Sequence, residues 1–263
     1  MTTPPAVPSD LLDELAEVAL EVALGAALLL ADYASKPLEQ VGTKSSPTDM
    51  VSEADRASEA YISDQLRRLR PQDSVLGEEG TAYAGTSGVT WVADPLDGTT
   101  NFLYRIPAWA VSLAATVGGR TVAGVVVDQS RGETWSAVEG LGAYCNGEPC
   151  HVAAGRAELS TALVATGFGY QKERRASQAA ILPKLLPAVR DIRRVGSAAL
   201  DLCWVAGGRF DAYYESHLNE WDWAAGRLVC QEAGGVVTKL AGEVVLATTP
   251  QLAAPLTQLL TGA

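Results

Sequence analysis

The sequence predicts an α+β fold in which helices and sheets alternate in layers. Segments with helical spacing are interleaved with short apolar strands along the chain, and the middle strands follow one another closely enough to form an antiparallel meander. The chain has 263 residues, 48% of them hydrophobic, which is enough for a sizeable core. No change in composition marks a linker. We therefore expect one domain over residues 1–263, with the Pro- and Thr-rich residues 1–8 disordered.

A long first helix is expected from about Ser9 to about Ala34. Its apolar run over residues 22–31 is shorter than the roughly 20 residues that a membrane span needs. The first eight residues also lack the basic segment of a secretory signal peptide. We therefore expect a cytoplasmic protein that does not bind membranes.

A second helix is expected to begin after Ser52, because Ser52 and Asp55 fit a capping box with Asp in place of Glu. A short strand over residues 74–76 follows this helix, and a polar loop over residues 81–88 follows the strand.

The middle of the chain has the alternation and the Gly turns of successive strands. Asn146-Gly147 has the composition of a two-residue hairpin turn, which would pair Cys145 with Glu148. The predicted strands cover residues 110–117, 121–127, 133–138 and 143–146.

The second half mixes helices and strands. A helix is expected over residues 178–190, although Pro183 and Pro187 disfavour it. The other predicted elements are helices over residues 197–206 and 221–233, strands over residues 210–214 and 236–240, and a helical tail from Pro250.

The charge of the chain excludes one class of function. The net charge is −11, whereas a nucleic-acid-binding surface needs clustered Lys and Arg. An acidic protein also repels anionic substrates, so a phosphate site here would need a bound cation. The four cysteines include no C-x-x-C pair, and we expect them to be reduced.

The most informative segment is Asp94-Pro95-Leu96-Asp97-Gly98-Thr99. A buried strand is expected to end at Ala93, because Pro95 has no N–H for a ladder, so both acids would lie on a turn. Two carboxylates held close together repel unless a cation lies between them, and such oxygen ligands suit Mg²⁺ or Mn²⁺. The N–H groups of Gly98 and Thr99 would suit a phosphate.

Two further acidic segments accompany this one. Glu78-Glu79 follows a predicted strand, and Asp222 lies in Trp221-Asp222-Trp223-Ala224-Ala225-Gly226. Each has an ordinary alternative: the two glutamates as solvated loop acids, and Asp222 as the N-cap of the helix that follows.

Taken together and in order, these segments resemble the inositol monophosphatase family of Mg²⁺-dependent, lithium-sensitive phosphatases. The resemblance covers nearly the whole chain. Its motifs are G-E-E at residues 77–79, D-P-[IL]-D-G-T at 94–99, W-D-x-A-A-G at 221–226, and shorter segments at 49–55, 196–199 and 211–215.

The resemblance implies an αβαβα sandwich of the type shared with fructose-1,6-bisphosphatase. It also implies a cofactor of two or three Mg²⁺ ions, with Mn²⁺ as an alternative. Glu78, Asp94 and the carbonyl of Leu96 would hold one ion, and Asp94, Asp97 and Asp222 would hold a second.

The catalytic roles also follow from the resemblance. A Mg²⁺-bound water near Glu78 and Thr99 would be the nucleophile. Asp49 would hydrogen-bond Thr99 as part of a proton relay, Gly98 and Thr99 would bind the phosphate, and Asp222 would lie near the leaving alkoxide.

The substrate contacts implied by the resemblance are Ser197, Ala198 and Glu215, which would meet polyol hydroxyls. A surface acid at the end of a strand is the alternative for Glu215. The expected reaction is hydrolysis of a small phosphorylated polyol, myo-inositol 1-phosphate first. The alternatives are histidinol phosphate, fructose 1,6-bisphosphate or 3′-phosphoadenosine 5′-phosphate as substrate, or a non-catalytic regulatory binding role. The family resemblance further implies a homodimer.

Overall fold

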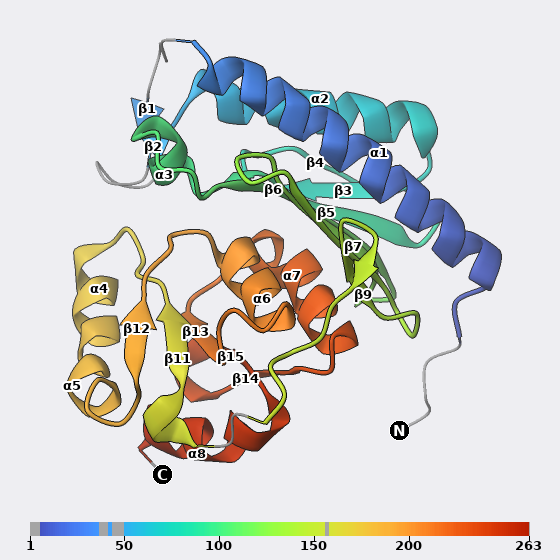
Figure 1. The fold of residues 1–263 in the computed structure, drawn as a ribbon. Helices are drawn as coiled ribbons and strands as arrows, with labels where there is room; N and C mark the ends of the chain where they lie inside the picture. The colour runs from blue at the N-terminus through green and yellow to red at the C-terminus, as the bar shows by residue number, and fades with distance from the viewer. Residues whose placement is uncertain (1–5, 37–41, 44–49, 156–157, 263) are drawn as a thin grey trace.

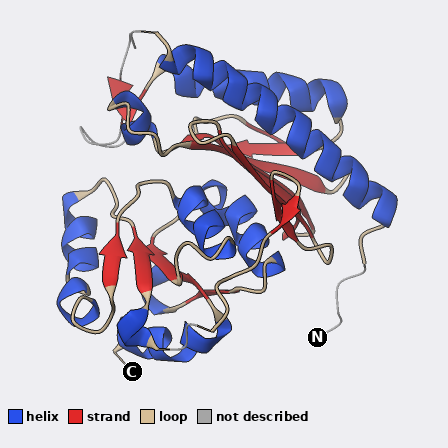
Figure 2. Cartoon of the chain, in the orientation of Figure 1, coloured by secondary structure: helices blue, strands red, loops and turns tan. Residues whose placement is uncertain are grey.

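The computed structural model describes residues 6–36, 42–43, 50–155 and 158–262. Five layers alternate through the molecule: helices, a large sheet, helices, a smaller sheet, and helices again (Figure 1). The predicted layered α+β fold is therefore confirmed. Colouring by secondary structure shows the two sheets, with α6 (Ala198–Ala206) and α7 (Glu220–Glu232) between them (Figure 2).

The first layer contains two helices, α1 (Ser9–Ala34) and α2 (Glu53–Leu69). The bounds of α1 agree with the sequence prediction. The capping box of α2 is also confirmed, because the backbone N–H of Ser52 donates to Oδ2 of Asp55 over 2.7 Å. Within the described residues, no helix has the length and apolarity that crossing a membrane would require.

The large sheet has eight strands in the order β10-β9-β8-β7-β6-β5-β3-β4. Strands β6 to β9 form the predicted antiparallel meander, which β5 and β10 extend at its two ends, whereas β3 runs parallel to β5. Cys145 pairs with Glu148 across the hairpin, as predicted. The bounds are β3 (Ser74–Gly77), β4 (Ala82–Tyr83), β5 (Val89–Asp97), β6 (Ala110–Val117), β7 (Arg120–Asp128), β8 (Glu133–Val138), β9 (Ala143–Cys145) and β10 (Glu148–Pro149). A separate pair joins β1 (Gly42–Thr43) to β2 (Met50–Val51).

The small sheet has five strands in the order β12-β11-β13-β15-β14. Its members are β11 (Leu163–Thr166), β12 (Asp191–Arg193), β13 (Ala212–Ser216), β14 (Val236–Lys239) and β15 (Val244–Thr248). The sequence prediction missed β11, β12 and β15, each of which has five residues or fewer. Strand β11 runs parallel to β12 and β13, so loops 167–171 and 217–219 leave the same edge of the sheet.

The helices of the second half are α4 (Lys172–Ala179), α5 (Leu182–Leu185), α6 (Ala198–Ala206), α7 (Glu220–Glu232) and α8 (Pro250–Thr261). The predicted continuous helix over residues 178–190 is wrong. Pro183 lies in the first turn of α5, where its missing N–H costs nothing, and the chain then turns into β12.

The core has two main parts, one on each face of the large sheet. Trp91 lies in the part beneath α1 and α2, and Trp135 lies in the part that α6 and α7 cover. All four cysteines are free thiols, as predicted.

Candidate active site

Glu78 lies directly after β3, on a loop that a buried glutamate holds in place. Oε1 of Glu59 in α2 accepts hydrogen bonds from the N–H groups of Glu79 at 3.0 Å and Thr81 at 3.2 Å. The N–H of Glu78 itself donates to the carbonyl of Ala93 on β5. The position of Glu78 at the C-terminal end of β3 therefore depends on Glu59. The sequence prediction missed Glu59.

Asp94 and Asp97 do not lie on a turn, so that prediction is wrong. Strand β5 continues through Pro95 to Asp97, with an irregular register between Asp94 and Asp97. Two residues of β5, Pro95 and Leu96, lie opposite the single residue Val111 of β6 at this point, which is a β-bulge. A bulge leaves one residue outside the ladder, so the missing N–H of Pro95 breaks no required bond. Both carboxylates are buried at the bulge, Asp94 with 2% and Asp97 with 9% of its surface exposed.

Thr99 begins the short helix α3 (Thr99–Leu103), after Gly98 with a φ of 90°. Its hydroxyl is 2.8 Å from Oδ1 of Asp55 and 3.1 Å from the carbonyl of Leu96. The predicted partner of Thr99 was Asp49, which lies outside the described residues. In the structure Asp55, which also caps α2, takes the hydrogen bond from Thr99.

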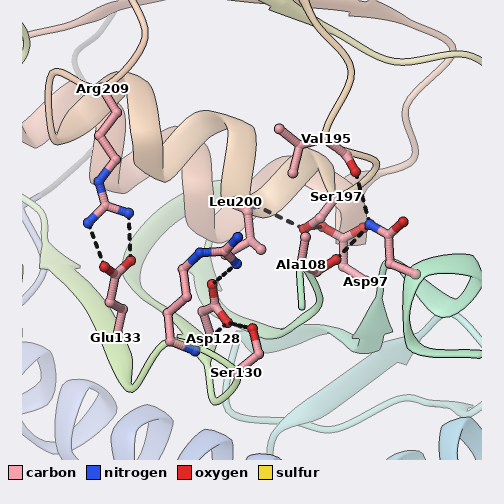
Figure 3. Close-up of polar contacts among 11 residues, drawn as sticks. Asp97, Ala108, Asp128, Ser130, Glu133, Val195, Ser197, Leu200 and Arg209 are labelled. Atoms are coloured by element: carbon pink, nitrogen blue, oxygen red, sulfur yellow. Dashed lines mark hydrogen bonds and ion pairs between the residues drawn. The ribbon is translucent and has the colours of Figure 1, made fainter. Parts of the chain in front are cut away.

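Ser197 and Asp97 join the two halves of the molecule. The hydroxyl of Ser197 donates to Oδ2 of Asp97 over 2.6 Å (Figure 3). The N–H of Ala199 donates to the same oxygen over 2.7 Å. Ser197 also accepts a hydrogen bond from the N–H of Leu200 as the N-cap of α6. The hydroxyl predicted to meet a substrate is thus already bonded within the protein.

Asp222 is the third residue of α7 rather than its N-cap. Its Oδ2 accepts a hydrogen bond of 2.6 Å from the N–H of Asn219, which precedes the helix. Asp222 also lines the cavity described next, so capping and a ligand role are compatible.

A pocket of about 290 Å³ brings most of the predicted residues together. Glu78, Asp97 and Asp222 line it, and so do Ser197, Ala198 and Glu215 from the second half. Asp94, Leu96, Gly98 and Thr99 do not line it, but Asp94 lies close enough to Glu78, Asp97 and Asp222 to feel their charges. The lining residues that the sequence prediction missed include Tyr170, Arg174, Arg194 and His217.

The buried carboxylates of the pocket hold protons more tightly than free ones do. Burial raises the pKa of Asp97 to about 6, although the hydrogen bonds from Ser197 and Ala199 oppose this rise. Burial, followed by repulsion from Glu78 and Asp97, raises the pKa of Asp94 and of Asp222 well above the ordinary value.

The donor set of the pocket fits a divalent cation. Its acids are hard oxygen donors, and their mutual repulsion is the kind of cost that a cation removes. In the described part of the chain, no three acid, histidine or cysteine side chains already stand as a ready metal-binding group. The fit therefore rests on donor chemistry and charge.

Comparison with known proteins gives a consistent result. The sequence model of the inositol monophosphatase family matches residues 11–262. The inositol-1-monophosphatase SuhB of Mycobacterium tuberculosis is 50% identical over 81% of this chain and 78% of its own. The Nus factor SuhB of Escherichia coli K12 is 40% identical over 86% of this chain and 85% of its own.

Solved structures agree in fold. The extragenic suppressor protein suhB of Bartonella henselae superposes with a TM-score of 0.87 at 37% identity, covering 93% of this chain and 97% of the other. The inositol monophosphatase of Anabaena gives 0.85 at 35% identity, with 97% and 98% covered. The SuhB of Mycobacterium tuberculosis gives 0.80 at 42% identity, with 98% of each chain covered.

Proposed function

The chain belongs to the inositol monophosphatase family and is a phosphatase, and we propose that its substrate is a small phosphate monoester, myo-inositol 1-phosphate first. The pocket carries this proposal, because it joins Glu78, Asp97 and Asp222 to Glu215 in one cavity. Acids that suit a cation and a phosphate would thus lie beside a carboxylate that suits a polyol hydroxyl. The relative from Mycobacterium tuberculosis is itself named an inositol-1-monophosphatase.

We assign the metal ligands within this proposal from the family resemblance, and their donor types are consistent with it. Glu78, Asp94 and the Leu96 carbonyl would hold one Mg²⁺, and Asp97 and Asp222 would share a second with Asp94. A third ion, or Mn²⁺ in place of Mg²⁺, fits the same oxygen donors. When bound, the ions would make water more acidic and offset the charge of the phosphate oxygens.

Thr99 would orient the attacking water. Its hydroxyl has one proton, which it gives to Asp55, and two lone pairs that remain acceptors. A water near Glu78 could therefore donate one proton to Thr99 while its own lone pair faces phosphorus. The N–H groups of Gly98 and Thr99 would bind phosphate oxygens.

Glu215 would select the alcohol that leaves. An ionised carboxylate accepts a hydrogen bond from a hydroxyl and rejects an analogue that lacks one, because the buried acceptor is then left unsatisfied. Asp222 lines the same pocket and would lie near the leaving oxygen.

Phosphate release from a panel of monoesters tests the proposal. The panel contains myo-inositol 1-phosphate, histidinol phosphate, fructose 1,6-bisphosphate and 3′-phosphoadenosine 5′-phosphate, each with Mg²⁺ and after chelation. We expect Mg²⁺-dependent release, fastest from inositol 1-phosphate. Release from none of them, with metal binding shown separately, would refute the proposal, and a faster rival would change the substrate.

A regulatory binding role is the second candidate, since the Escherichia coli relative at 40% identity is named a Nus factor. The Asp94→Asn variant separates the two roles, because it removes a buried acid assigned to both metal sites. A cellular phenotype that survives the loss of activity would favour the regulatory role, and one that disappears with activity would favour catalysis.

Lithium sensitivity and a homodimer also belong to this proposal. A lithium titration in the phosphate-release assay tests the first property. Light scattering on the purified protein tests the second.

A further inference from the structure

An apolar groove of about 310 Å³ runs beside α1. None of the described residues that line it also lines the active-site pocket. Its lining includes Leu20 of α1, Val138 of β8, Tyr144 of β9, and Leu141 from the loop between those two strands. An apolar groove that opens to solvent is typical of an interaction site.

The groove exists because two helices cover only part of the eight-stranded sheet. Helix α2 packs on β5, and α1 packs mainly on β6 and β7. Because helices pack about 8–10 Å apart and strands about 4.8 Å apart, each helix covers about two strands. Strands β8 and β9 lie beyond β7. Their α1 side therefore extends past α1 by the width that one further helix would cover.

The alternation of β8 shows which side chains face this strip. Trp135 and Ala137 pack in the part of the core that α6 and α7 cover. Successive side chains of a strand point to opposite faces, so Ser136 and Val138 lie on the α1 side. Tyr144 of β9 pairs with Ser136 in the sheet and lies on the same side. The strip is thus a surface of mixed but mainly apolar character.

Leu141 is held beside the groove by a fixed loop. Gly140 and Gly142 have φ angles of 77° and 85°. Their N–H groups donate to Oε1 and Oε2 of Glu232 in α7, each over 2.9 Å. Leu141 between them is nevertheless 56% exposed. A leucine that is already ordered and still exposed can bind a partner with little further loss of conformational entropy.

The face of α1 that borders the groove combines leucines with acids. Asp13, Glu17, Leu20 and Leu24 recur at spacings of three or four residues and therefore share one face. Leu20 is 38% exposed and Leu24 is 36% exposed. Of the described residues that line the groove itself, only Glu17 is charged.

Asp13 and Glu17 differ from the acids on the α2 side of the same helix. Glu14 pairs with Arg70, and Glu21 pairs with Arg68. Asp13 and Glu17 form no ion pair with any residue in the described part of the chain. The border of the groove therefore has negative charge that a basic partner would neutralise.

The charges also decide against a second copy of this chain as the occupant. Among the described helices, α1 is the one with exposed leucines at helical spacing, namely Leu20, Leu24 and Leu28. A second α1 in the groove would bring its own Asp13 and Glu17 towards those of the first. Such like charges repel, and no basic residue of the groove offsets them.

We propose that this groove binds an amphipathic helix of a partner protein, with an apolar stripe against Leu20 and Leu141 and basic residues towards Asp13 and Glu17. Binding of an amphipathic helix in an apolar groove is a common mode of protein recognition. The proposal goes beyond the phosphatase function and does not depend on it.

Three synthetic peptides of about 18 residues, long enough for about five helical turns, test the groove. The first has leucines in one helical stripe and lysines elsewhere. The second has glutamate in place of each lysine, and the third has the composition of the first in an order without a stripe. Calorimetry is performed with Mg²⁺ present. We expect the first peptide to bind at least about tenfold more tightly than either of the others. Added salt should weaken its binding.

Variants of the protein locate the binding. Leu20→Ser and Leu141→Ser should each weaken the first peptide about tenfold, because each removes apolar surface that the complex buries. Glu17→Gln should weaken it about threefold, the usual size of an exposed ion pair. Leu186→Ser, at a leucine that is 46% exposed in the other half, and Glu148→Gln, at an exposed acid of β10, are the matched controls and should bind as the wild type does.

Circular dichroism confirms that each variant is folded, and phosphate release should be unchanged in all of them. Equal affinities for the lysine and glutamate peptides would refute the proposal. So would a loss of affinity in Glu148→Gln as large as that in Glu17→Gln, because the peptide would then respond only to overall charge. Competitive inhibition of phosphate release would place the peptide in the active site and would also refute it.

Light scattering tests the alternative occupant. If the wild type is a dimer that Leu141→Ser converts to a monomer, the groove is an interface between copies and the proposal is wrong. An oligomeric state that Leu20→Ser and Leu141→Ser leave unchanged supports it, together with the peptide result. Failure of these tests leaves the phosphatase proposal intact, and failure of phosphate release leaves the groove to be judged by peptide binding.

Discussion

The phenol of Tyr213 donates a hydrogen bond of 2.8 Å to Oε2 of Glu215. Both residues belong to β13 and lie two positions apart, so their side chains share one face of the sheet. From another side, the backbone of Gly167 comes so close that a Cβ there would overlap the Glu215 carboxylate. The fully buried phenol of Tyr213 and the backbone of Gly167 thus fix the orientation of the Glu215 side chain at the pocket.

Replacing Tyr213 by Phe removes this hydrogen bond and keeps the ring. We expect KM for inositol 1-phosphate to rise about tenfold, because Glu215 loses the charge-assisted bond that orients it. KM for p-nitrophenyl phosphate, which has no polyol hydroxyl, should change much less. Tyr214→Phe is the control, since Tyr214 packs into the core on the opposite face of the sheet. An equal rise for both substrates would mean that Tyr213 only supports the fold.

The pH dependence of KM provides a second test of the same pair. Burial raises the pKa of Glu215 to about 7, while the hydrogen bond from Tyr213 and the charge of Arg194 oppose this rise. Only the ionised form accepts from a substrate hydroxyl with both oxygens, so KM for inositol 1-phosphate should fall as pH rises through about 7. In Tyr213→Phe the inflection should move to higher pH. A KM that stays constant across this range would exclude the role of Glu215.

Local patterns in the sequence were enough to predict much of the fold. The meander was predicted correctly because β8 alternates in burial and because Gly118-Gly119 and Asn146-Gly147 mark tight turns between its strands. Strands β11 and β12 were missed because they are short and are stabilised by pairing with strands that are distant in the sequence rather than by a local pattern.

The part of the site that the sequence could predict is the set of residues whose type alone suggests a chemical role. The spacing of Asp94 and Asp97 led us to expect a cation site, although these residues lie at a β-bulge and not on the predicted turn. Glu59 has a local clue, because it shares the inner stripe of α2 with Ile62 and Leu66. The position of Arg194 over Gly196 has no local clue in the sequence. It depends on the φ of 98° at Gly196, which only the folded chain defines.

Ser197→Ala tests the link between the two halves of the molecule. The variant loses the donor to Asp97 and the N-cap of α6, and we expect a loss of about 1–2 kcal/mol of unfolding free energy in urea. Because that hydrogen bond opposes the rise in the pKa of Asp97, the variant should also need more Mg²⁺ for half-maximal activity. Ser130→Ala is the matched control, as its hydroxyl donates to Asp128 over 2.6 Å, away from the pocket (Figure 3). An unchanged Mg²⁺ requirement in Ser197→Ala would contradict this prediction.

Glu59→Ala tests how the Glu78 loop is held. The variant leaves the N–H groups of Glu79 and Thr81 without their acceptor, so Glu78 should lose its fixed position and Mg²⁺ affinity should fall about tenfold. Glu59→Gln keeps an oxygen acceptor and should restore most of the affinity. Glu53→Ala, an exposed acid on the same helix, should behave as the wild type. Titration of Mg²⁺ by calorimetry measures all four proteins, and failure of Gln to rescue would show that the charge of Glu59 matters rather than its acceptor.

The metal-free protein should lose stability as pH rises from about 4 to above 6. Asp97 has a pKa of about 6 in the folded protein, and the pKa values of Asp94 and Asp222 are raised as well. Between the ordinary and the raised values, the folded state keeps protons that the unfolded state releases, so the free energy of unfolding falls as pH rises. Mg²⁺ competes with those protons, and its stabilising effect should be larger at about pH 7.5 than at about pH 5.

Thermal unfolding with and without Mg²⁺ measures both effects. Asp94→Asn should weaken both, whereas Glu148→Gln, which removes an exposed acid of β10, should leave them intact. If the metal-free protein instead became more stable as pH rises, the buried acids would not hold protons in the folded state.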